Sequence, residues 1–409
     1  KPSFIPNKVA KNIALQSTNE AHVEKEEHSS VDEINGPILT PSSPSDDATQ
    51  FDIGCVANPV VLPPSNTNQK WQMYYYGNAG SWNHNQNCFL PTGWCGLAES
   101  HDGIKWTKVA GPLEGGAILS PSSSSDAWDA IHIGVGDVVR VETTSTTTKE
   151  QQHTSELHMY YFGASGEEVA MESSSGSSSI IGMKMRIGRA VSLDEGRTWE
   201  KSGVVLDSDE NEGFFASWPR LIVPQQGNGD DDDDRKEPWR MLYHSFNGKK
   251  WRVFGAESFD CGDTWTKTGL VLEGGDEEAN SFDSAGIGTR AVAPWRDGLL
   301  MVYEGVNSTS LRHCLGAAYC EDVHGGGEWT KLESAEPIME PGKDPLGDWT
   351  CQVIGTPWLV AMEDGSLRLY HCAKSGPDAK MSIGVLISDS GDISSTSWRK
   401  STLQDTIQT

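Results

Sequence analysis

Four acidic side chains occupy matching positions in successive segments of the sequence. Asp52, Asp129, Glu212 and Asp283 each lie seven residues before the same point of an apolar run, and the fifth segment has Thr350 there. Glycoside hydrolysis needs one protonated carboxyl group that donates to the leaving oxygen, and a second, ionised carboxylate that activates water or attacks the anomeric carbon. Acids that share one pocket raise one another's pKa, which helps to form such a pair. Whether these acids meet depends on the strands that carry them.

The acids precede the first strand of a pattern that recurs five times. Each copy has an apolar strand around a Pro or Gly, an aromatic strand such as WQMYYYG (71–77), a small-residue strand such as GWCGLAES (93–100), and a short strand after a Lys. Four antiparallel strands repeated five times predict an all-β, five-bladed β-propeller. The blades are expected at residues 51–113, 128–206, 212–272, 283–339 and 350–399. The first strand of each blade would line the central channel, so the acids would converge at one end of its axis.

The ends of the chain and its low-complexity segments complete this domain. The fifth copy lacks a last strand, whereas GPILTPSS (36–43) resembles the linker GGAILSPSSSS (115–125). We therefore expect residues 36–40 to lie beside the fifth blade and help close the ring, which would protect strand edges. Residues 1–35 are expected to be a flexible extension of the single domain 36–409. Three low-complexity segments, 143–156, 172–179 and 225–237, are predicted to be solvated loops.

One eight-residue motif, Ser-x-Asp-x-Gly-x-Thr-Trp, occurs twice, as SLDEGRTW (192–199) and SFDCGDTW (258–265). Its Asp can accept bonds from the amides of its own turn, and its Gly can supply a positive φ. The Trp would place a large apolar surface between neighbouring blades. The motif resembles the Asp box of sialidases and other propellers, which implies a structural role for Asp194 and Asp260.

Composition excludes several classes of partner and cofactor. A net charge of −26 would repel nucleic acid and anionic membranes, and no apolar run is long enough for membrane insertion. The sequence has no CxxC pair, and we predict neither a metal nor another cofactor. Cys88 and Cys95 lie close enough to bridge, while the other six cysteines fall in strand-like runs and are expected to be small buried residues. The sequon at Asn307 fits a secretory route, so a secreted or organellar location is favoured over a cytosolic one.

The architecture and the strand signatures WQMYYYG and GLAESHDGIKW resemble the arabinanase/levansucrase/invertase superfamily, glycoside hydrolase families 32, 43, 62 and 68. The resemblance covers residues 36–409. It implies that Asp52 is the base or nucleophile, that Asp129 orients and tunes, and that Glu212 is the acid. The Asn-Asp-Pro-Asn-Gly, Arg-Asp-Pro and Glu-Cys motifs of invertase-like sequences are missing. Family 43 members usually place Pro directly after the first Asp, whereas Ile53 follows Asp52.

Other residues are predicted to bind substrate. The loop 78–94 would bring Trp82, His84 and Trp94 to the rim, where aromatic rings can stack on sugars. Glu304 ends its aromatic strand where other copies carry Gly, Ser or Cys, which makes it the alternative acid.

Asp283, Arg220 and Arg290 complete the predicted pocket. The two arginines lie on first strands, so they could clamp a carboxylate or sulfate substituent or neutralise the nearby acids.

Three functions are compatible with these residues. The first is a glycoside hydrolase-like protein that acts on or binds a carbohydrate through carboxylates at the channel mouth. The second is a non-catalytic propeller that binds a glycan or a protein partner. The third, a sialidase-like enzyme, is disfavoured because sialidases have six blades and an arginine triad.

Overall fold

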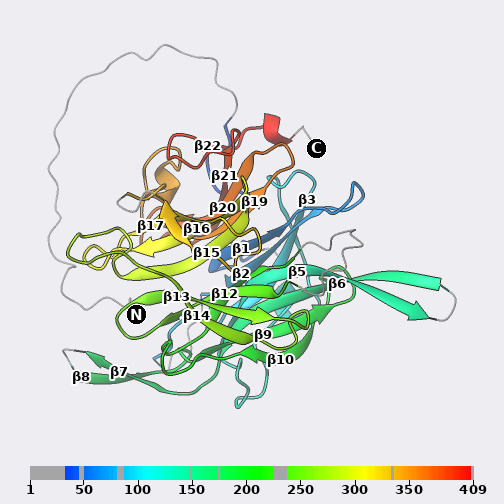
Figure 1. Ribbon diagram of the computed structural model, residues 1–409, viewed down its shortest axis with the longest axis horizontal. Coiled ribbons are helices and arrows are strands. Elements are labelled where there is room, and N and C mark those ends of the chain that lie inside the picture. Colours follow the sequence, from blue (N-terminus) through cyan, green and yellow to red (C-terminus); the bar gives the residue numbers. More distant parts are fainter. Residues whose placement is uncertain are drawn as a thin grey trace, which may run out of the picture.

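The computed structural model describes residues 33–45, 50–80, 87–147, 150–173, 176–224, 237–332 and 336–406. The fold is all-β, as predicted, and is built mainly of antiparallel units of four strands (Figure 1). Three short 3-10 helices, Glu114–Gly116, Asp348–Thr350 and Gln404–Thr406, lie in the connections of this described part. No helix in these ranges is long and apolar enough to cross a membrane.

The sheets follow one another along the chain, and in each one the strands lie side by side in chain order. The first sheet contains β1 (Cys55–Leu62), β2 (Trp71–Asn78), β3 (Trp94–Ser100) and β4 (Thr107–Val109). The second contains β5 (His132–Thr147), β6 (Glu150–Ala164), β9 (Met185–Ser192) and β10 (Glu200–Leu206), with the hairpin β7 (Val169–Ser173) and β8 (Gly176–Ile180) inserted between β6 and β9.

The next eight strands form two such units that a single parallel bridge, Trp251 to Gly286, joins into one sheet. The first of these units, called the third sheet below, contains β11 (Ser217–Ile222), β12 (Trp239–Phe246), β13 (Trp251–Ser258) and β14 (Thr266–Glu273). The second of these units, the fourth sheet, contains β15 (Gly286–Trp295), β16 (Gly298–Val306), β17 (His313–Cys320) and β18 (Thr330–Leu332). The last sheet contains β19 (Val353–Ala361), β20 (Leu367–Lys374), β21 (Ser382–Ser388) and β22 (Arg399–Lys400).

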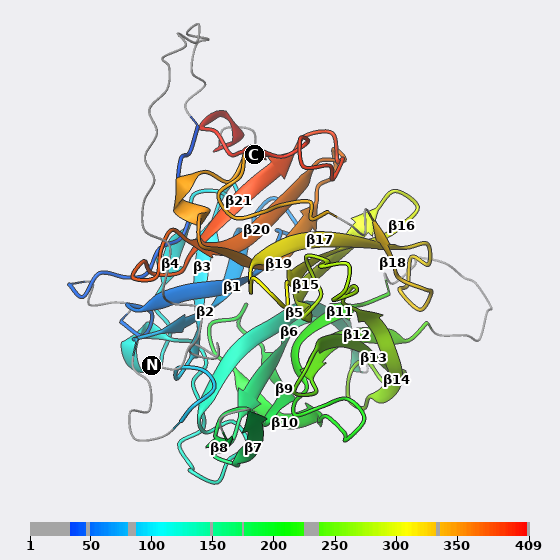
Figure 2. The same cartoon turned by 90° about the vertical axis from the view of Figure 1, so that its left-hand side faces the viewer.

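The first strand of each unit contacts the first strands of its neighbours. Contacts join β1 to β5, β5 to β11, β11 to β15, β15 to β19, and β19 back to β1. Figure 2 shows these five strands innermost, with the later strands of each unit farther out. Second strands such as β2 and β16 are almost wholly buried, whereas the fourth strand β14 alternates exposed and covered residues. Continuous apolar runs and alternating patterns are the expected signatures of these two environments.

Apolar clusters fill the spaces between adjacent sheets. One cluster packs Val56 and Met73 of the first sheet against Tyr370 and Ile383 of the last, together with Leu39. Leu39 also forms an antiparallel bridge to Ile383 on β21. The segment at residues 36–40 therefore lies beside the last sheet, as its sequence predicts.

The two copies of the motif fold into nearly identical turns, one between β9 and β10 and the other between β13 and β14. Asp194 Oδ1 accepts bonds from Ser192 Oγ at 2.8 Å and from Thr198 N at 2.9 Å. Gly196 has a φ of 80°, and a Cβ there would lie 2.1 Å from the hydroxyl of Tyr74 on the first sheet. The turn thus requires glycine both for its own backbone and for the approach of the neighbouring sheet.

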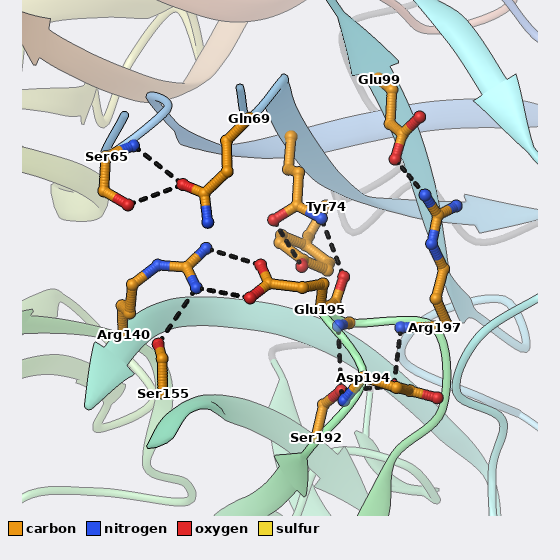
Figure 3. A network of polar contacts seen from close by, with 12 residues as sticks. Ser65, Gln69, Tyr74, Glu99, Arg140, Ser155, Ser192, Asp194, Glu195 and Arg197 are labelled. Atoms are coloured by element: carbon orange, nitrogen blue, oxygen red, sulfur yellow. Dashed lines mark hydrogen bonds and ion pairs between the residues drawn. The ribbon is translucent and has the colours of Figure 1, made fainter. Parts of the chain in front are cut away.

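Side chains of this turn tie the second sheet to the first (Figure 3). Gln72 Nε2 on β2 donates to Glu195 O at 2.8 Å, and Arg197 pairs with Glu99 on β3. Within the second sheet, Glu195 accepts two bonds of 2.9 Å from Arg140 on β5. Trp199 packs edge-on against Tyr74, with ring centroids 5.7 Å apart. The motif joins neighbouring sheets, and its aspartate already accepts the hydrogen bonds of its own turn.

Several predictions about connections and thiols are wrong. The described parts of segments 143–156 and 172–179 belong to the hairpins β5–β6 and β7–β8, because Thr- and Ser-rich runs can pair as strands that extend from the body (Figure 1). Segment 225–237 lies outside the described residues except for Glu237. Cys261 and Cys351, which were expected to be buried, are exposed because they lie in connections between strands. Cys88 and Cys95, whose bridging the sequence left open, are free thiols.

The last residues of the segment predicted as an N-terminal extension lie beside the last sheet. Residues 1–32 lie outside the described residues, whereas Glu33 bridges Thr402 and Ile34 N donates to Ser401 O at 2.8 Å. Residues 33–35 therefore belong with the last sheet.

Candidate functional site

Each of the four predicted acids lies in a buried cluster with one tyrosine and one lysine of its own sheet. Asp129 Oδ2 accepts a bond of 3.2 Å from the Tyr161 hydroxyl and pairs with Lys201 Nζ at 2.6 Å. The same arrangement joins Asp52 to Tyr75 and Lys108 (2.9 and 2.6 Å), Glu212 to Tyr243 and Lys267 (2.5 and 2.8 Å), and Asp283 to Tyr303 and Lys331 (3.1 and 2.6 Å). We call these four sets the acid–tyrosine–lysine clusters.

The clusters lie across the faces of the individual sheets. The tyrosine comes from the second strand and the lysine from the fourth, which is the outermost strand of each unit. Glycines of the second strands leave room for the acids: a Cβ on Gly163 would lie 2.5 Å from Asp129 Cβ, and one on Gly77 2.6 Å from Asp52 Cβ. Each acid is therefore directed over its own sheet, and the structure does not bring the four together.

The electrostatics of the clusters favours a structural role. Burial, and next the adjacent carboxylate, raises the pKa of Tyr161 well above its ordinary value, so its hydroxyl stays a donor. A buried carboxylate is tolerated when a cation and hydrogen bonds compensate it, as Lys201 and Tyr161 do for Asp129. The roles of base, orienting acid and general acid given to Asp52, Asp129 and Glu212 stay predictions.

The first strands share a distortion at one point near the centre of the molecule. The register of every first strand shifts there, for example between Ala57 and Val60 and between Ser217 and Arg220. Bulges of this kind change the direction of side chains and often lie next to active sites. Three bulge residues also have positive φ, namely Asn58 (52°), Trp218 (47°) and Thr356 (43°). Such strain concentrates at functional sites.

Glu304 lies beside these bulges and is held by three different strands. Its carboxylate accepts bonds from His313 Nδ1 on β17 at 2.5 Å, from Thr356 N on β19 at 3.2 Å, and from the Thr289 hydroxyl on β15. The Glu304 side chain is 13% exposed and that of His313 is 37% exposed. The alternative acid of the sequence is thus the one that reaches the inner strands.

The pair of Glu304 and His313 is polarised by its surroundings. Burial opposes ionisation of both groups, but their mutual hydrogen bond and opposite charges outweigh it. The pKa of Glu304 is therefore lowered and that of His313 is raised. These shifts favour the ionised carboxylate and the protonated imidazole, and Nε2 of His313 has no hydrogen-bond partner among the described residues.

A group of aromatic rings surrounds the strained residue Trp218 on the first strand of the third sheet. Trp218 is half-buried, stacks on His244 with ring centroids 5.1 Å apart, and lies 4.0 Å from the ring of Phe162. His244 Nδ1 is 2.7 Å from Arg290 Nη2, and Arg290 is next in the chain to Thr289. Side-chain contacts therefore run from Trp218 to Arg290, and the chain neighbour of Arg290, Thr289, bonds Glu304.

Two arginines are buried further along the first strands. Arg220 and Arg290 are 2% and 0% exposed, and Arg220 Nε donates to Arg290 O at 2.6 Å. Asp137 accepts bonds of 2.7 Å from Val138 N and Leu221 N, and burial raises its pKa to about 6 although Arg220 opposes the shift. Both arginines face inward, as their strands suggested.

Of the three predicted rim residues, the structure describes Trp94. Trp82 and His84 lie outside the described residues. Trp94 is half-buried at the start of β3 and packs against the cluster that contains Phe51 and Tyr75. Within the described ranges, no group of three or more His, Cys, Asp or Glu side chains could hold a metal ion.

Comparisons with known proteins place the fold among glycoside hydrolases. No protein-family model matches the chain, and no curated protein matches it. A glycosyl hydrolase from Bacteroides ovatus is similar in structure, with a TM-score of 0.54, 15% sequence identity, and coverage of 87% of this chain and 93% of that one. The fold is thus a propeller-type fold of the kind found in glycoside hydrolases.

Two further solved structures agree. A structure from family GH130 of mannoside phosphorylases, which contains glycoside hydrolases that target β-1,2 mannosidic linkages in Candida mannan, has a TM-score of 0.53, 16% identity, and coverage of 90% of this chain and 96% of that one. A thermostable family-43 glycoside hydrolase has a TM-score of 0.53 at 14% identity, with coverage of 85% and 93%. At such identities the likeness establishes the fold.

The sequence did not predict the residues that bond Glu304, nor did it predict Trp218 as a site residue. His313 and Thr356 lie on other strands, and no spacing within one segment connects them to Glu304. The one available signal was the exception itself, an acid where the other segments carry Gly, Ser or Cys.

Proposed function

We propose that the chain is a five-bladed β-propeller whose ring closes between the first and last sheets. The circuit of contacts among the five first strands supports closure. Trp106 of the first sheet packs edge-on against Tyr370 of the last, with centroids 6.3 Å apart, as Trp199 does against Tyr74 elsewhere. The bridge from Leu39 to β21 supports a closing role for the N-terminal segment.

We propose that this propeller binds a carbohydrate beside the bulges of its inner strands. The observation that carries the proposal is Glu304, a partly exposed carboxylate held by donors from three strands next to the strained Thr356. Carboxylates and imidazoles offer hydrogen bonds to sugar hydroxyls, and the half-buried ring of Trp218 offers a stacking face. The likeness to glycoside hydrolase folds supports a sugar as the ligand.

Binding without hydrolysis is the form of this function that the side chains favour. Most glycoside hydrolases, inverting or retaining, use two carboxyl groups that flank the scissile bond. Lysines compensate Asp52, Asp129 and Glu212 within their own sheets, and Asn58 directly precedes Pro59 where the family-43 pattern has Asp before Pro. An amide cannot serve as the base.

A hydrolase centred on Glu304 and His313 is the second candidate. The His313 imidazolium could donate its Nε2 proton to the leaving oxygen while water adds to the anomeric carbon and releases a proton to the solvent. The raised pKa of His313, which the hydrogen bond to Glu304 maintains against burial, favours this chemistry.

A glycan microarray, followed by calorimetric titration of the hits and an assay for released reducing ends, tests both candidates. We expect binding that Trp218→Gly and Glu304→Gln weaken at least about tenfold, since each removes a direct contact. Glycine tolerates the positive φ at position 218, so that variant removes the ring without adding strain. Glu257→Gln, which alters an ion pair with Arg240 on the third sheet, is the matched control and should bind normally.

The outcomes separate the two candidates. Binding without sugar release supports the binding protein, and release that Glu304→Gln abolishes supports the hydrolase. If folded protein binds no glycan, or if both variants bind as the wild type does, the carbohydrate proposal is wrong.

A further inference from the structure

A cavity of about 590 Å³ lies between the connection that follows the first sheet and the outer strand of the second. Residues of the connection between positions 112 and 127 form one wall, and Thr198, Trp199 and Lys201 form the other. Binding sites for small molecules have volumes in this range. We call it the outer cavity, because it is separate from the site at Glu304, whose bonds come from inner strands of the fourth and last sheets.

Both walls of the outer cavity are held in place. In the connection, Ile118 N donates to Cys95 O and Cys95 N donates to Leu119 O, both at 2.9 Å, so the chain forms a short bridge to β3. Lys201 Nζ donates to Ser120 O at 2.7 Å and thereby ties β10 to the same connection. A site with fixed walls loses little conformational entropy when a ligand binds.

One part of the lining is apolar and includes an indole ring. Trp199 is half-buried, its ring packs edge-on against Tyr74, and its Nε1 donates to Gly196 O at 3.0 Å. Leu113, which is 38% exposed, and Pro121 line the same cavity. A fixed indole ring beside aliphatic groups can pack against the C–H face of a sugar ring.

The rest of the lining offers hydroxyl groups that solvent reaches. Ser123 and Ser124 are exposed, and their side chains have no hydrogen-bond partner among the described residues. Ser122 Oγ accepts a bond of 3.2 Å from Lys201, so its own proton is free to donate. Thr198 is exposed and donates its proton within its own turn at 2.6 Å, so its oxygen is free to accept. A ligand with several hydroxyl groups would find both donors and acceptors here.

The charge of the lining favours a neutral ligand. Lys201 is the one ionisable residue among the described lining residues, and Asp129 compensates it at 2.6 Å. A charged ligand would leave water without gaining an unpaired opposite charge from these residues, which is costly. A neutral polyhydroxyl compound loses nothing in this way.

We propose that the outer cavity is a second carbohydrate site, which binds a short neutral oligosaccharide against Trp199 and through the serine hydroxyls at positions 122–124. The kind of ligand rests on the proposed function, whereas the cavity itself does not involve Glu304 or Trp218. One polysaccharide chain could therefore be held at two separate points of the molecule.

The full chain carrying Trp218→Gly and Glu304→Gln, which weaken the inner site, tests the outer cavity by itself. The probes are cellotriose, xylotriose and mannotriose, followed by saturation-transfer NMR and titration calorimetry. We expect at least one of these neutral trisaccharides to bind with a dissociation constant in the millimolar range or tighter.

Further substitutions in that background locate the binding. Ser124→Trp should fill the cavity and reduce binding at least about tenfold, because position 124 is an exposed part of the wall and its backbone bond from Ala127 N remains. Ser123→Ala with Ser124→Ala removes two hydroxyls and should weaken binding about threefold or more. Ser395→Trp places the same ring on an exposed connection of the last sheet, so it is the matched control and should not change binding.

The outcomes separate this inference from the proposed function. Trisaccharide binding in the inner-site variant, lost with Ser124→Trp and kept with Ser395→Trp, supports the outer site. The inference is overturned if the wild type binds glycans but the inner-site variant binds none, or if Ser124→Trp binds normally while folded. If the folded wild type binds no glycan, the proposed function and this inference both fail.

Discussion

Replacing Lys201 by Met tests whether the acid–tyrosine–lysine clusters stabilise the fold. Lys201 Nζ is 2.6 Å from Asp129 Oδ2 and also donates to Ser120 O at 2.7 Å. Asp129 is 1% exposed, and without the lysine the donor left to it among the described residues is the Tyr161 hydroxyl at 3.2 Å. The variant would leave a buried carboxylate with one neutral hydrogen bond.

The expected loss can be bounded from these contacts. Removing one partner of a buried ion pair costs about 3–5 kcal/mol, and an exposed pair contributes about 0–1 kcal/mol. The lysine side chain is 26% exposed, so water replaces part of what it loses. We therefore expect the lower end, about 3 kcal/mol, for Lys201→Met.

Urea unfolding followed by circular dichroism at neutral pH measures this loss, with Lys70→Met as the control. Lys70 pairs with Glu99 at 3.1 Å but is 46% exposed, so its loss should cost under about 1 kcal/mol. The double variant Asp129→Asn/Lys201→Met should cost less than the sum of the single variants, because it removes both charges together.

A loss below about 1 kcal/mol for Lys201→Met would refute the reasoning, because the pair would then behave as a surface pair. Additive costs of the two single variants would do the same. In either case a catalytic role for Asp129 would regain support.

Three further predictions concern separate parts of the molecule. Gly196→Ala should destabilise the protein by about 1–3 kcal/mol or more, measured by the same unfolding assay, because it strains a φ of 80° and meets the Tyr74 hydroxyl; an unchanged midpoint would contradict the turn geometry. Asn307 should carry no glycan when folded protein is made through a secretory route, because its side chain is 7% exposed and its Nδ2 donates to Ser281 O at 2.9 Å; mass spectrometry of the intact protein would reveal an error. The pKa of His313, followed by NMR, should lie above 6.5 and fall in Glu304→Gln. Since that pKa is raised and that of Glu304 is lowered, the stabilisation from the pair is fully present between the ordinary pKa values of glutamate and histidine. It is lost as pH rises through the pKa of His313 in the folded protein or falls through that of Glu304.

Much of the framework followed from local pattern alone. Strand order within each sheet is the one predicted, because apolar, aromatic and small-residue strands recur with polar turns between them. The turns at Asp194 and Asp260 were also predicted, since their hydrogen bonds lie within eight consecutive residues. Contacts of this range are encoded in spacing.

The pairing of each acid with a lysine of the fourth strand was harder to predict, although the sequence contained a signal for it. A lysine follows every closing tryptophan by two residues, as Lys201 follows Trp199 and Lys267 follows Trp265. An inference from the first strand alone directs the acid to the channel. Only the face of the folded sheet shows that the acid turns toward the outer strand, because register and bulges decide which way each residue points.

The third sheet shows that each cluster behaves as a packed unit. In the first sheet Phe51 precedes the acid and stacks on Tyr75, over a strand glycine whose Cβ would lie 2.5 Å from the phenylalanine ring. In the third sheet Asn211 precedes the acid, and Phe254 replaces the strand glycine and stacks on Tyr243, with centroids 6.0 Å apart. The ring comes from a different strand and fills the same space, as close packing requires.

The last sheet provides the strongest argument that these clusters serve the fold. Thr350 replaces the acid, and His371 replaces the tyrosine at the same position of the second strand. Lys400 remains, and its Nζ donates to Asn35 Oδ1 at 2.8 Å and lies 3.9 Å from a carboxylate oxygen of Glu33. A lysine without its buried acid thus binds the N-terminal segment, which lies beside the last sheet. The change of partner follows from sheet geometry and needs no substrate, whereas the contacts of Glu304 across three strands have no counterpart among the described residues of the other sheets.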